Sequence, residues 1–483
     1  MSRQAETGPE ALDFLKKKGY YFTKMAKTVD PGNMKVRNEV ADSILLVLNS
    51  YDKMEFSSDL KHLFRKKLKE KYNKNIEVEL VAMAELGQTR GNLTGYLRTH
   101  ERIKKLLSKK KLDSFDTVVY IHDAGLATRI FPLSYEFGTP SKASIRFPEG
   151  RAPDMLLPCV AKSVPILKNT IVILPIDQCF DYVEIDIEGL IRSLNNNTAS
   201  MLLTPIEIKK ALGNLGTAKL GSKNEIVSFY EKTFDEKLIP KYGKNMTLAN
   251  TFQLFTTKEN MDKLQNALDL FCSKEKNKDF ITHLNATEWS FNKMVCEALV
   301  LKKNALSKVQ LAMRECLLQY EISVGGAIAN GYWIDWASNI MTYLELLRKL
   351  TAQMVKPDEN GNYFVRSKKI KPSSKLESCI FIDCDTVDLF GSYKNCIFIA
   401  NEWVRIMNCF TGNGSLFYAL KKKNFLRKEM NYKLFAHFLS GRRNIEFECD
   451  IYDDYRNLYS AMKKVSDDWL YYHEVLKESY NTK

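Results

Sequence analysis

No run of apolar residues in this 483-residue sequence approaches the length of about 20 that a membrane helix needs. The first residues, MSRQAETGPEALDFLKKKGYYF, also lack the basic start and the apolar core of a signal peptide. The composition, with 45% hydrophobic and 27% charged residues, is that of an ordinary soluble globular protein. These features predict a cytoplasmic protein without a membrane span, long enough for two or three domains.

Metal sites built on cysteine or histidine have little basis in the sequence. The ten cysteines are scattered and include no CxxC pair of the kind found in zinc and thioredoxin-like sites. The six histidines include no HxxxH or HExxH spacing. Cys179, Cys379 and Cys396 lie in strongly apolar runs, where a free thiol behaves as a small hydrophobic side chain. We therefore expect these three cysteines to be free thiols in apolar surroundings.

Positive charge, in contrast, is in excess, and the net charge is +14. Basic runs such as Lys109–Lys111 and Lys421–Lys423 can attract nucleic acid, an acidic surface or a polyphosphate ligand. No RNA-recognition or zinc-finger signature accompanies these runs, so the plainer interpretation is that they are solvated helix faces. A nucleic-acid partner is therefore the weakest of the functions that the sequence suggests.

The N-terminal part of the sequence has a helical pattern. Apolar residues recur there at three- and four-residue spacing, with charged residues between them, at Val36, Val40, Ile44, Val47 and Leu48. This pattern predicts mostly helix over residues 10–72. We expect residues 1–75 to form a helical extension that packs on the core.

The middle of the sequence, residues 76–354, alternates between strand and helix patterns. Such alternation is typical of an α/β domain with a mostly parallel sheet, whose ligands bind beyond the C-terminal ends of the strands. Strands are predicted at 76–84, in the apolar run that opens 117–132, and at 169–177, 199–206 and 224–232. The connections are predicted as a glycine-containing turn at 87–95 with a basic helix to Lys111, helix at 181–194 and 258–320, and a loop leading into a helix at 331–350.

The C-terminal part has short, β-rich pieces. Residues 355–362, VKPDENGN, are the best candidate for a linker. The sequence CIFI at 379–382 recurs at 396–399, a period of 17 residues that is about one coil of a left-handed β-helix. This repeat predicts a short β-solenoid over residues 363–414, with a plain pair of hairpins as the alternative. From residue 415 to 483 we expect helices.

One stretch, TVVYIHDAGLATRIFP at 117–132, raises a functional question. An apolar run that predicts a buried strand is followed directly by a turn of small residues with one arginine, Arg129. Unpaired backbone N–H groups after such a strand bind phosphate, and Gly125 lets the main chain approach a nucleotide. The alternative is a tight turn whose arginine pairs with a surface carboxylate.

This stretch resembles the signature of the sugar-1-phosphate nucleotidyltransferases, (A/G)GxGTRLxPLT followed by a lysine. Residues Ala124–Ser134 match it, with Ala127 where the family usually has glycine, and the lysine is present as Lys142. The resemblance implies that Ala124 and Gly125 bind the nucleotide. It also implies that Arg129 stabilises the leaving pyrophosphate and that Lys142 contacts the nucleotide phosphates.

Four further residues match the family in the correct order along the chain. Asp177 matches its metal-binding aspartate after a strand, and Lys232 matches the lysine of FxEKP, which contacts the sugar phosphate. Asn250 resembles the asparagine of N-x-G-x-Y, although the glycine is missing. Asp335 resembles the second metal-binding aspartate, in WxDxGT, with Ala337 and a serine replacing Gly-Thr.

Each match has a plainer alternative. Asp177 and Asp335 could each cap a following helix, and Lys232 could be a solvated lysine at a strand end. Tyr332, Trp333 and Trp336, which surround Asp335, are expected in the core rather than at a sugar.

The flanking sequence resembles the fucose-1-phosphate guanylyltransferase branch of this family. Shared features are about a hundred residues before the signature, a glycine-rich turn (here Gly91–Gly95), a histidine before the loop (His122) and a later β-helical segment. The fold implied is α/β, a Rossmann-like nucleotidyltransferase domain with a mostly parallel sheet, an N-terminal helical extension, and a C-terminal short β-solenoid plus helices.

The activity implied is transfer of a nucleotidyl group from a nucleoside triphosphate to a sugar-1-phosphate, assisted by Mg²⁺ at Asp177 and Asp335. A sugar-1-phosphate is already ionised at neutral pH, so catalysis rests on positioning and on neutralising charge rather than on a general base. The alternative is a catalytically degenerate relative that serves as a binding or regulatory subunit, as in the translation-factor exchange subunits. A homo-oligomer is compatible with either function.

Overall fold

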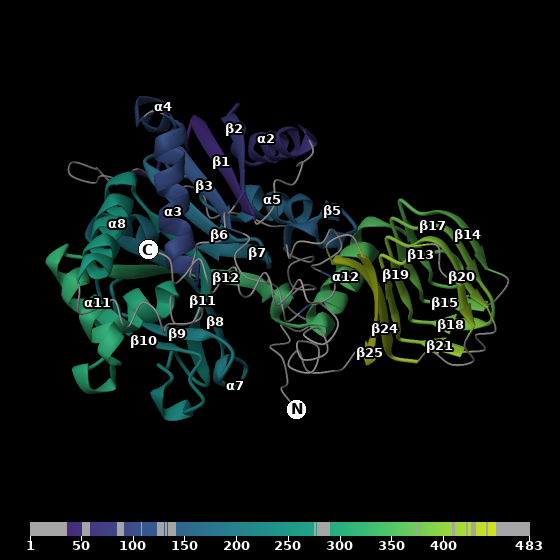
Figure 1. Ribbon diagram of the computed structural model, residues 1–483. Coiled ribbons are helices and arrows are strands. Elements are labelled where there is room, and N and C mark those ends of the chain that lie inside the picture. Colours follow the sequence, from purple (N-terminus) through teal and green to yellow (C-terminus); the bar gives the residue numbers. More distant parts are fainter. Residues whose placement is uncertain are drawn as a thin grey trace. The chain divides into compact units, whose positions relative to one another are not determined.

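The computed structural model divides the chain into two compact units (Figure 1). One unit takes the described residues up to position 124 and those of 157–334, and the other takes those of 125–156 and 335–479. None of the helices among the described residues is long and apolar enough to cross a membrane. The described residues are 36–50, 58–84, 91–107, 109–122, 130, 133, 142–274, 277, 290–372, 375–407, 411–421, 424–426, 431–440 and 443–450.

A ten-stranded sheet forms the centre of the first unit. The strand order is β2-β1-β3-β6-β11-β8-β12-β7, with β9 paired to β11 and β10 paired to β9. β1 is parallel to β2 and β3, β3 to β6, and β12 to β8, whereas β11 is antiparallel to β6 and β8. The predicted α/β fold with a mostly parallel sheet is therefore confirmed. The strands are β1 (Ser43–Ser50), β2 (Glu77–Ala84), β3 (Thr117–His122), β6 (Thr170–Pro175), β7 (Gln178–Ile185), β8 (Ala199–Glu207), β9 (Gly216–Leu220), β10 (Ile226–Glu231), β11 (Met246–Thr256) and β12 (Val324–Asp335).

Three helices share a hydrophobic core with one face of this sheet. Alternate residues of a strand point to the same face, and Leu45 and Val47 of β1 lie in one buried cluster with Val118 and Tyr120 of β3. Apolar residues of α3, α8 and α11 belong to the same cluster, together with residues of α4, η6 and α10. The helices are α2 (Ser58–Tyr72), α3 (Gly91–Leu106), α4 (Lys109–Asp113), α5 (Ala152–Ser163), α6 (Ile187–Asn196), α7 (Ile208–Ala211), α8 (Lys258–Ser273), η6 (Asn292–Glu297), α10 (Ala298–Val300) and α11 (Lys308–Gln319), with single turns η4 (Glu236–Leu238) and η7 (Lys303–Ala305).

The prediction of helix over residues 43–50 was wrong, because this segment is β1. Its residues pair one for one with β2 on one side and with β3 on the other, so it is a strand inside the sheet, buried on both faces. A continuous apolar run of this length fits a buried strand as well as it fits a helix. Of the predicted N-terminal extension, the described helix is α2, and residues 1–35 lie outside the described residues.

Other predicted element boundaries also differ from those in the structure. Gly91–Gly95, predicted as a turn, opens α3. The first part of the predicted helix 181–194 belongs to β7, and α6 begins at Ile187 after Asp186, whose side chain caps it. The sequence GYWID at 331–335, predicted as a loop, ends β12. The strands predicted at 76–84, at the start of 117–132, and at 169–177, 199–206 and 224–232 correspond to β2, β3, β6, β8 and β10.

The second unit is built around three sheets of mostly parallel strands, the green and yellow arrows of Figure 1, in which only the last pair, β24 and β25, is antiparallel among the described pairs. Successive strands go to successive sheets, in the orders β13-β16-β19-β22-β24-β25, β14-β17-β20-β23 and β15-β18-β21. The strands are β13 (Tyr363–Val365), β14 (Lys368–Pro372), β15 (Lys375–Glu377), β16 (Ile380–Ile382), β17 (Asp385–Leu389), β18 (Ser392–Lys394), β19 (Ile397–Ile399), β20 (Glu402–Met407), β21 (Thr411–Asn413), β22 (Leu416–Tyr418), β23 (Asn424–Leu426), β24 (Lys433–Ser440) and β25 (Arg443–Asp450).

The two CIFI segments pair in parallel, Ile380 with Ile397 and Ile382 with Ile399, so they are neighbouring turns of a β-solenoid rather than a pair of hairpins. The left-handed sense of the coil stays a prediction. Helix predicted from residue 415 was wrong as far as residue 450, where β22 to β25 continue the strands, and residues 451–483 lie outside the described residues.

A column of phenylalanine rings fills the solenoid. The Phe381 and Phe417 rings stack on opposite faces of Phe398, each with its centroid 4.6 Å from that of Phe398. The corners of the coil recur with the same period, since Arg366, Asp383 and Ala400 all have positive φ. This conformation is uncommon for residues other than glycine, and its recurrence shows that successive turns have the same corner geometry.

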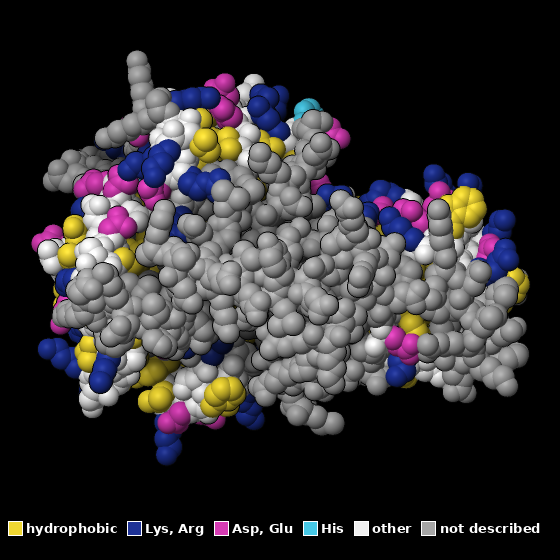
Figure 2. Space-filling model, viewed as in Figure 1, with side chains coloured by type: hydrophobic (Ala, Val, Ile, Leu, Met, Phe, Trp, Pro, Cys, Tyr) yellow, Lys and Arg dark blue, Asp and Glu magenta, His cyan; other side chains and the backbone are white. Residues whose placement is uncertain are grey.

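Charges of both signs lie side by side on the face shown in Figure 2, where dark blue lysine and arginine side chains adjoin magenta acidic ones. Ion pairs among the described residues include Lys111 with Glu79 at 3.1 Å and Lys394 with Glu377 at 2.7 Å. Because Lys111 belongs to the run Lys109–Lys111, its pairing favours the interpretation of that run as a solvated surface.

The ring column gives a prediction about stability. Phe398→Ala removes a fully buried ring from the middle of the column and should lower the free energy of unfolding by about 3–5 kcal/mol. Phe364→Ala is the control, because Phe364 begins the column, stacks on Phe381 and is 38% exposed. Denaturant unfolding of both variants measures the difference. Equal losses would mean that the column does not carry the stability of the solenoid.

Candidate functional site

The C-terminal ends of three adjacent parallel strands of the first unit lie in one row. Asn49 of β1 pairs with His122 of β3, and His122 pairs with Pro175 of β6. The chain passes from these ends into residues 51–57, residues 123–129 and the Ile176–Asp177 turn. Open parallel sheets bind their ligands at this edge.

The signature residues divide between described and undescribed parts of the chain. Ala124, Gly125 and Arg129 lie outside the described residues, so their nucleotide-binding and catalytic roles stay predictions. Lys142 opens the single turn η3 (Lys142–Ser144) and is half-buried in the second unit.

Asp177 lies at the turn between β6 and β7, two residues after the row of strand ends. The alternative that it caps a helix is wrong, since the chain continues directly into β7. Its neighbour Gln178 is 1% exposed, donates a hydrogen bond to the carbonyl oxygen of Thr251, and accepts one from Gln253 at 3.2 Å. The turn that carries Asp177 is therefore tied to the middle of β11.

The middle of β11 contains a bulge. Asn250 pairs with Leu203 of β8 and Leu254 pairs with Met201, so β11 advances four residues while β8 advances two. Phe252 lies in the bulge with φ of 59°. Its N–H donates to Oδ1 of Asn250 at 2.8 Å, which holds this conformation. Phe252 occupies the glycine position of the N-x-G segment, where glycine would adopt positive φ without strain.

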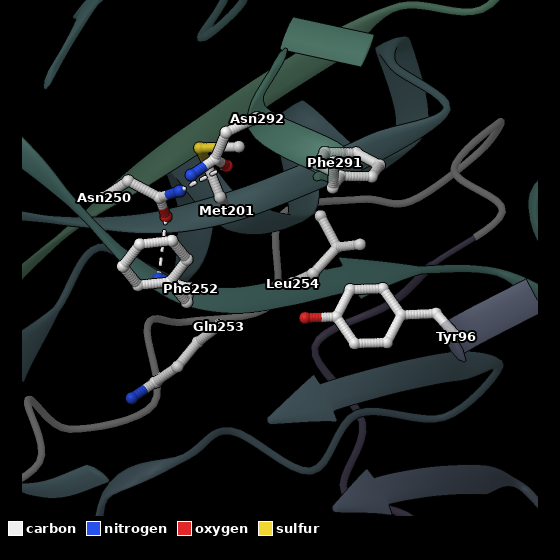
Figure 3. A pocket seen from close by; sticks show the side chains of 8 residues that line it. All are labelled: Tyr96, Met201, Asn250, Phe252, Gln253, Leu254, Phe291 and Asn292. Carbon is white, nitrogen blue, oxygen red and sulfur yellow. Dashed lines mark hydrogen bonds between the residues drawn. The ribbon is translucent and has the colours of Figure 1, made fainter. Parts of the chain in front are cut away.

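A small pocket lies beside this bulge (Figure 3). Its cavity volume is about 10 Å³, room for one water molecule but not for a sugar. Three aromatic rings and three amide side chains contribute to the wall. The lining residues are Tyr96, Met201, Asn250, Phe252, Gln253, Leu254, Phe291 and Asn292.

A chain of hydrogen bonds connects Asn250 to the end of β10. Nδ2 of Asn250 donates to Oδ1 of Asn292 at 2.8 Å, and Nδ2 of Asn292 donates to Oε2 of Glu231 at 2.8 Å. Lys232 follows Glu231 directly, with φ of 52°, and its N–H donates to the carbonyl oxygen of Leu215 at 3.2 Å. Two predicted residues, Asn250 and Lys232, thus belong to one connected group in the first unit.

Desolvation dominates the electrostatics of this group. Burial raises the pKa of Glu231 above its ordinary value, Lys232 and the hydrogen bond from Asn292 oppose the shift, and Glu297 adds to it. Burial also raises the pKa of the Glu297 carboxyl. Glu297 accepts the main-chain N–H of Glu231 at 2.8 Å. The sequence interpretation named Lys232 but missed Glu231, although the quoted FxEKP motif contains this glutamate.

Asp335 belongs to the second unit, at the end of β12 and before the single turn η8 (Trp336–Ser338). Its side chain does not cap that turn, so the capping alternative fails here also. Trp333 and Trp336 are buried, as predicted, and the Trp336 ring lies edge-on to Phe147 with centroids 5.1 Å apart.

Mg²⁺ is the cofactor that the resemblance implies. Among the described residues no three His, Cys, Asp or Glu side chains are grouped to hold a metal. Mg²⁺ is commonly held by one or two carboxylates together with substrate phosphates, and Asp177 and Asp335 are the carboxylates that the resemblance names. Their joint role as metal ligands stays a prediction.

The segment that begins with Lys142 is fastened to the solenoid within the second unit. It continues into a hairpin of β4 (Arg146–Phe147) and β5 (Gly150–Arg151). The Arg366 guanidinium donates to the carbonyl oxygens of Phe147, at 3.2 Å, and Pro148. Arg366 also pairs with Asp383, at 2.6 and 3.0 Å.

These contacts of Arg366 predict that the substitution Arg366→Ala has a local effect. Loss of two bonds to main-chain carbonyls and of one ion pair should lower the free energy of unfolding by about 1–2 kcal/mol, since the guanidinium is partly exposed. Amide hydrogen exchange of residues 146–151 should accelerate. Arg405→Ala is the control, because Arg405 pairs with Asp388 at 3.1 Å on the same solenoid and should cost at most about 0.5 kcal/mol. Unchanged amide hydrogen exchange in the β4–β5 hairpin would contradict this role of Arg366.

The raised pKa of Glu231 predicts a pH-dependent effect of Glu231→Gln. The folded protein holds the Glu231 proton more tightly than the unfolded chain does, so wild-type stability falls as pH rises from the unfolded pKa through the folded one. The glutamine variant lacks this loss, and its melting temperature should rise relative to wild type as pH increases above the ordinary glutamate pKa. Glu236→Gln, at an exposed position, should show no such trend. Parallel curves for wild type and Glu231→Gln would refute the assignment.

Comparison with known proteins gives little to identify this chain. No family model and no curated protein match it. Among solved structures, the crystal structure of mannose-1-phosphate geranyltransferase from Thermus thermophilus is similar at 12% identity, over 88% of this chain and 99% of that chain, with a TM-score of 0.29. A TM-score that low gives no ground for transferring a function, which has to be argued from the residues of this chain.

Proposed function

We propose that this protein transfers a nucleotidyl group from a nucleoside triphosphate to a sugar-1-phosphate and releases pyrophosphate. The observation that carries the proposal is the hydrogen-bonded chain Asn250–Asn292–Glu231 beside a pocket in the first unit. It joins two segments that match the family motifs independently, the one with Asn250 and the one with Lys232.

The pocket has the chemistry of a sugar site. Its amide groups can pair with hydroxyl groups, and aromatic rings such as Tyr96 and Phe291 can pack against a sugar ring. Its volume of about 10 Å³ requires a wall to move before a sugar enters. The Phe252 ring is the best candidate, because it is only half-buried and its backbone is strained.

The proposed reaction needs no general base. A phosphate oxygen of the sugar-1-phosphate attacks the α-phosphorus, the new oxygen–phosphorus bond forms, and the bond from the α-phosphorus to the bridging oxygen breaks as pyrophosphate leaves. In this scheme Lys232 holds the sugar phosphate, Lys142 contacts the nucleotide phosphates, and Arg129 neutralises charge on the pyrophosphate. Ala124 and Gly125 admit the nucleotide to the backbone.

Asp177 and Asp335 would hold Mg²⁺ in this scheme, as hard carboxylate ligands that such a cation prefers. When bound, the ion supplies positive charge that offsets the charge of the triphosphate. The position of Asp177 at a strand end, on a turn tied to β11 through Gln178, supports its part of the assignment.

The test is pyrophosphate release with Mg²⁺, the four nucleoside triphosphates and a panel of sugar-1-phosphates. Lys232→Ala should reduce turnover by about 10²–10³-fold, the usual effect of removing one group that stabilises transferring charge. Lys237→Ala, at an exposed lysine nearby, is the matched control and should leave turnover unchanged.

Two outcomes would count against catalysis. If the wild-type chain binds triphosphate but releases no pyrophosphate with any sugar phosphate, the degenerate binding or regulatory alternative takes its place. If Lys232→Ala turns over at the wild-type rate, Lys232 returns to the interpretation of a solvated lysine at a strand end.

A further inference from the structure

The segment η6, Asn292–Glu297, is a π-helix that turns polar groups inward. π-helical turns are rare and occur often at functional sites. Asn292 is 2% exposed and begins the segment, while Glu297 ends it and accepts the main-chain N–H of Glu231. Gln310 of α11 holds Glu297 in turn, by donating to its Oε2 at 3.0 Å.

The orientation of the Asn292 amide is fixed by its partners. The nitrogen of Asn250 can only donate, so the Asn292 atom that faces it has to be an acceptor. Asn292 must therefore present Oδ1 to Asn250 and Nδ2 to Glu231, as it does at 2.8 Å in both cases. Asn250 in turn fixes the main chain at Phe252, because Oδ1 of Asn250 accepts the N–H of Phe252. Figure 3 shows the Asn292, Asn250 and Phe252 part of this chain.

We infer that Asn292 is the positioning residue of the pocket: it fixes the Asn250 amide and the Glu231 carboxylate in one arrangement and, through Asn250, sets the bulge that carries Phe252. The inference rests on the proposed function for its link to sugar phosphate. Asn292 acts through its neighbours, since its Oδ1 and Nδ2 are both committed to them. Sequence patterns did not indicate this role, because no feature marks the segment as π-helical.

The test exchanges the amide and the carboxyl between positions 292 and 231. Asn292→Asp alone places two carboxyl groups face to face, near the charges of Lys232, Lys293 and Glu297. One of the pair must hold a proton when folded, so its folded pKa is raised and stability present at about pH 5 is lost toward about pH 8. Glu231→Gln alone is the matched control, because its amide oxygen can still accept from Asn292.

The double variant N292D/E231Q restores a donor opposite an acceptor, with the direction of the hydrogen bond reversed. We expect its melting temperature at about pH 8 to recover to that of E231Q. We also expect calorimetric titration with sugar-1-phosphates to give an affinity close to that of E231Q, while N292D binds about tenfold more weakly or worse.

Two results would overturn the inference. One is an N292D variant that is as stable and binds as well as wild type at about pH 8. The other is a double variant that recovers neither stability nor binding. A wild-type chain that binds no sugar phosphate would instead refute the proposed function, and the recovery of stability in the double variant would then decide by itself whether Asn292 fixes its two neighbours.

Discussion

The candidate site depends on one irregularity in the sheet, the bulge in β11. A strand that paired regularly with β8 would keep its side chains alternating strictly between the two faces. Between the pairs Asn250–Leu203 and Leu254–Met201, β11 has two more residues than β8. This bulge interrupts the alternation and changes the direction in which the side chains there point. Gln253 then reaches Gln178 beside Asp177, while Asn250 reaches Asn292 on η6. The bulge thus connects the end of β6 with the end of β10.

The second unit shows a different constraint, which is regular repetition. A period of 17 residues places Phe381 on Phe398 and Asp385 beside Glu402, so each turn fixes the next. The same regularity sets Arg366 at a corner, from which it reaches the carbonyl oxygens of the hairpin after Lys142. In a solenoid each turn is stabilised by its neighbours. The neighbouring turns therefore hold Arg366 in the position from which it binds the hairpin.

The predictability of each element follows from how local its cause is. Strands such as β6 and β8 are marked by continuous apolar runs between turns, and the repeated CIFI sequence marked the solenoid. β1 was mistaken for helix because burial on both faces removes the alternation that identifies a strand. The strands after residue 415 were missed because their repeats diverge from CIFI. Asn292 could not be found, since its role arises from a π-helical backbone and from partners that are 42 and 61 residues away in the sequence.

Two costly features belong to the hydrogen-bonded group beside this pocket, Phe252 with its positive φ and the desolvated Glu231. Neither is needed to build the sheet. Glycine would relieve the strain at position 252, and an apolar residue would avoid the desolvation cost at 231. Folding alone therefore favours other residues at both positions. The hydrogen bonds from Asn292 and to Asn250 offset part of the cost and hold both features in a single conformation, which is the arrangement expected where strain and charge serve a binding site.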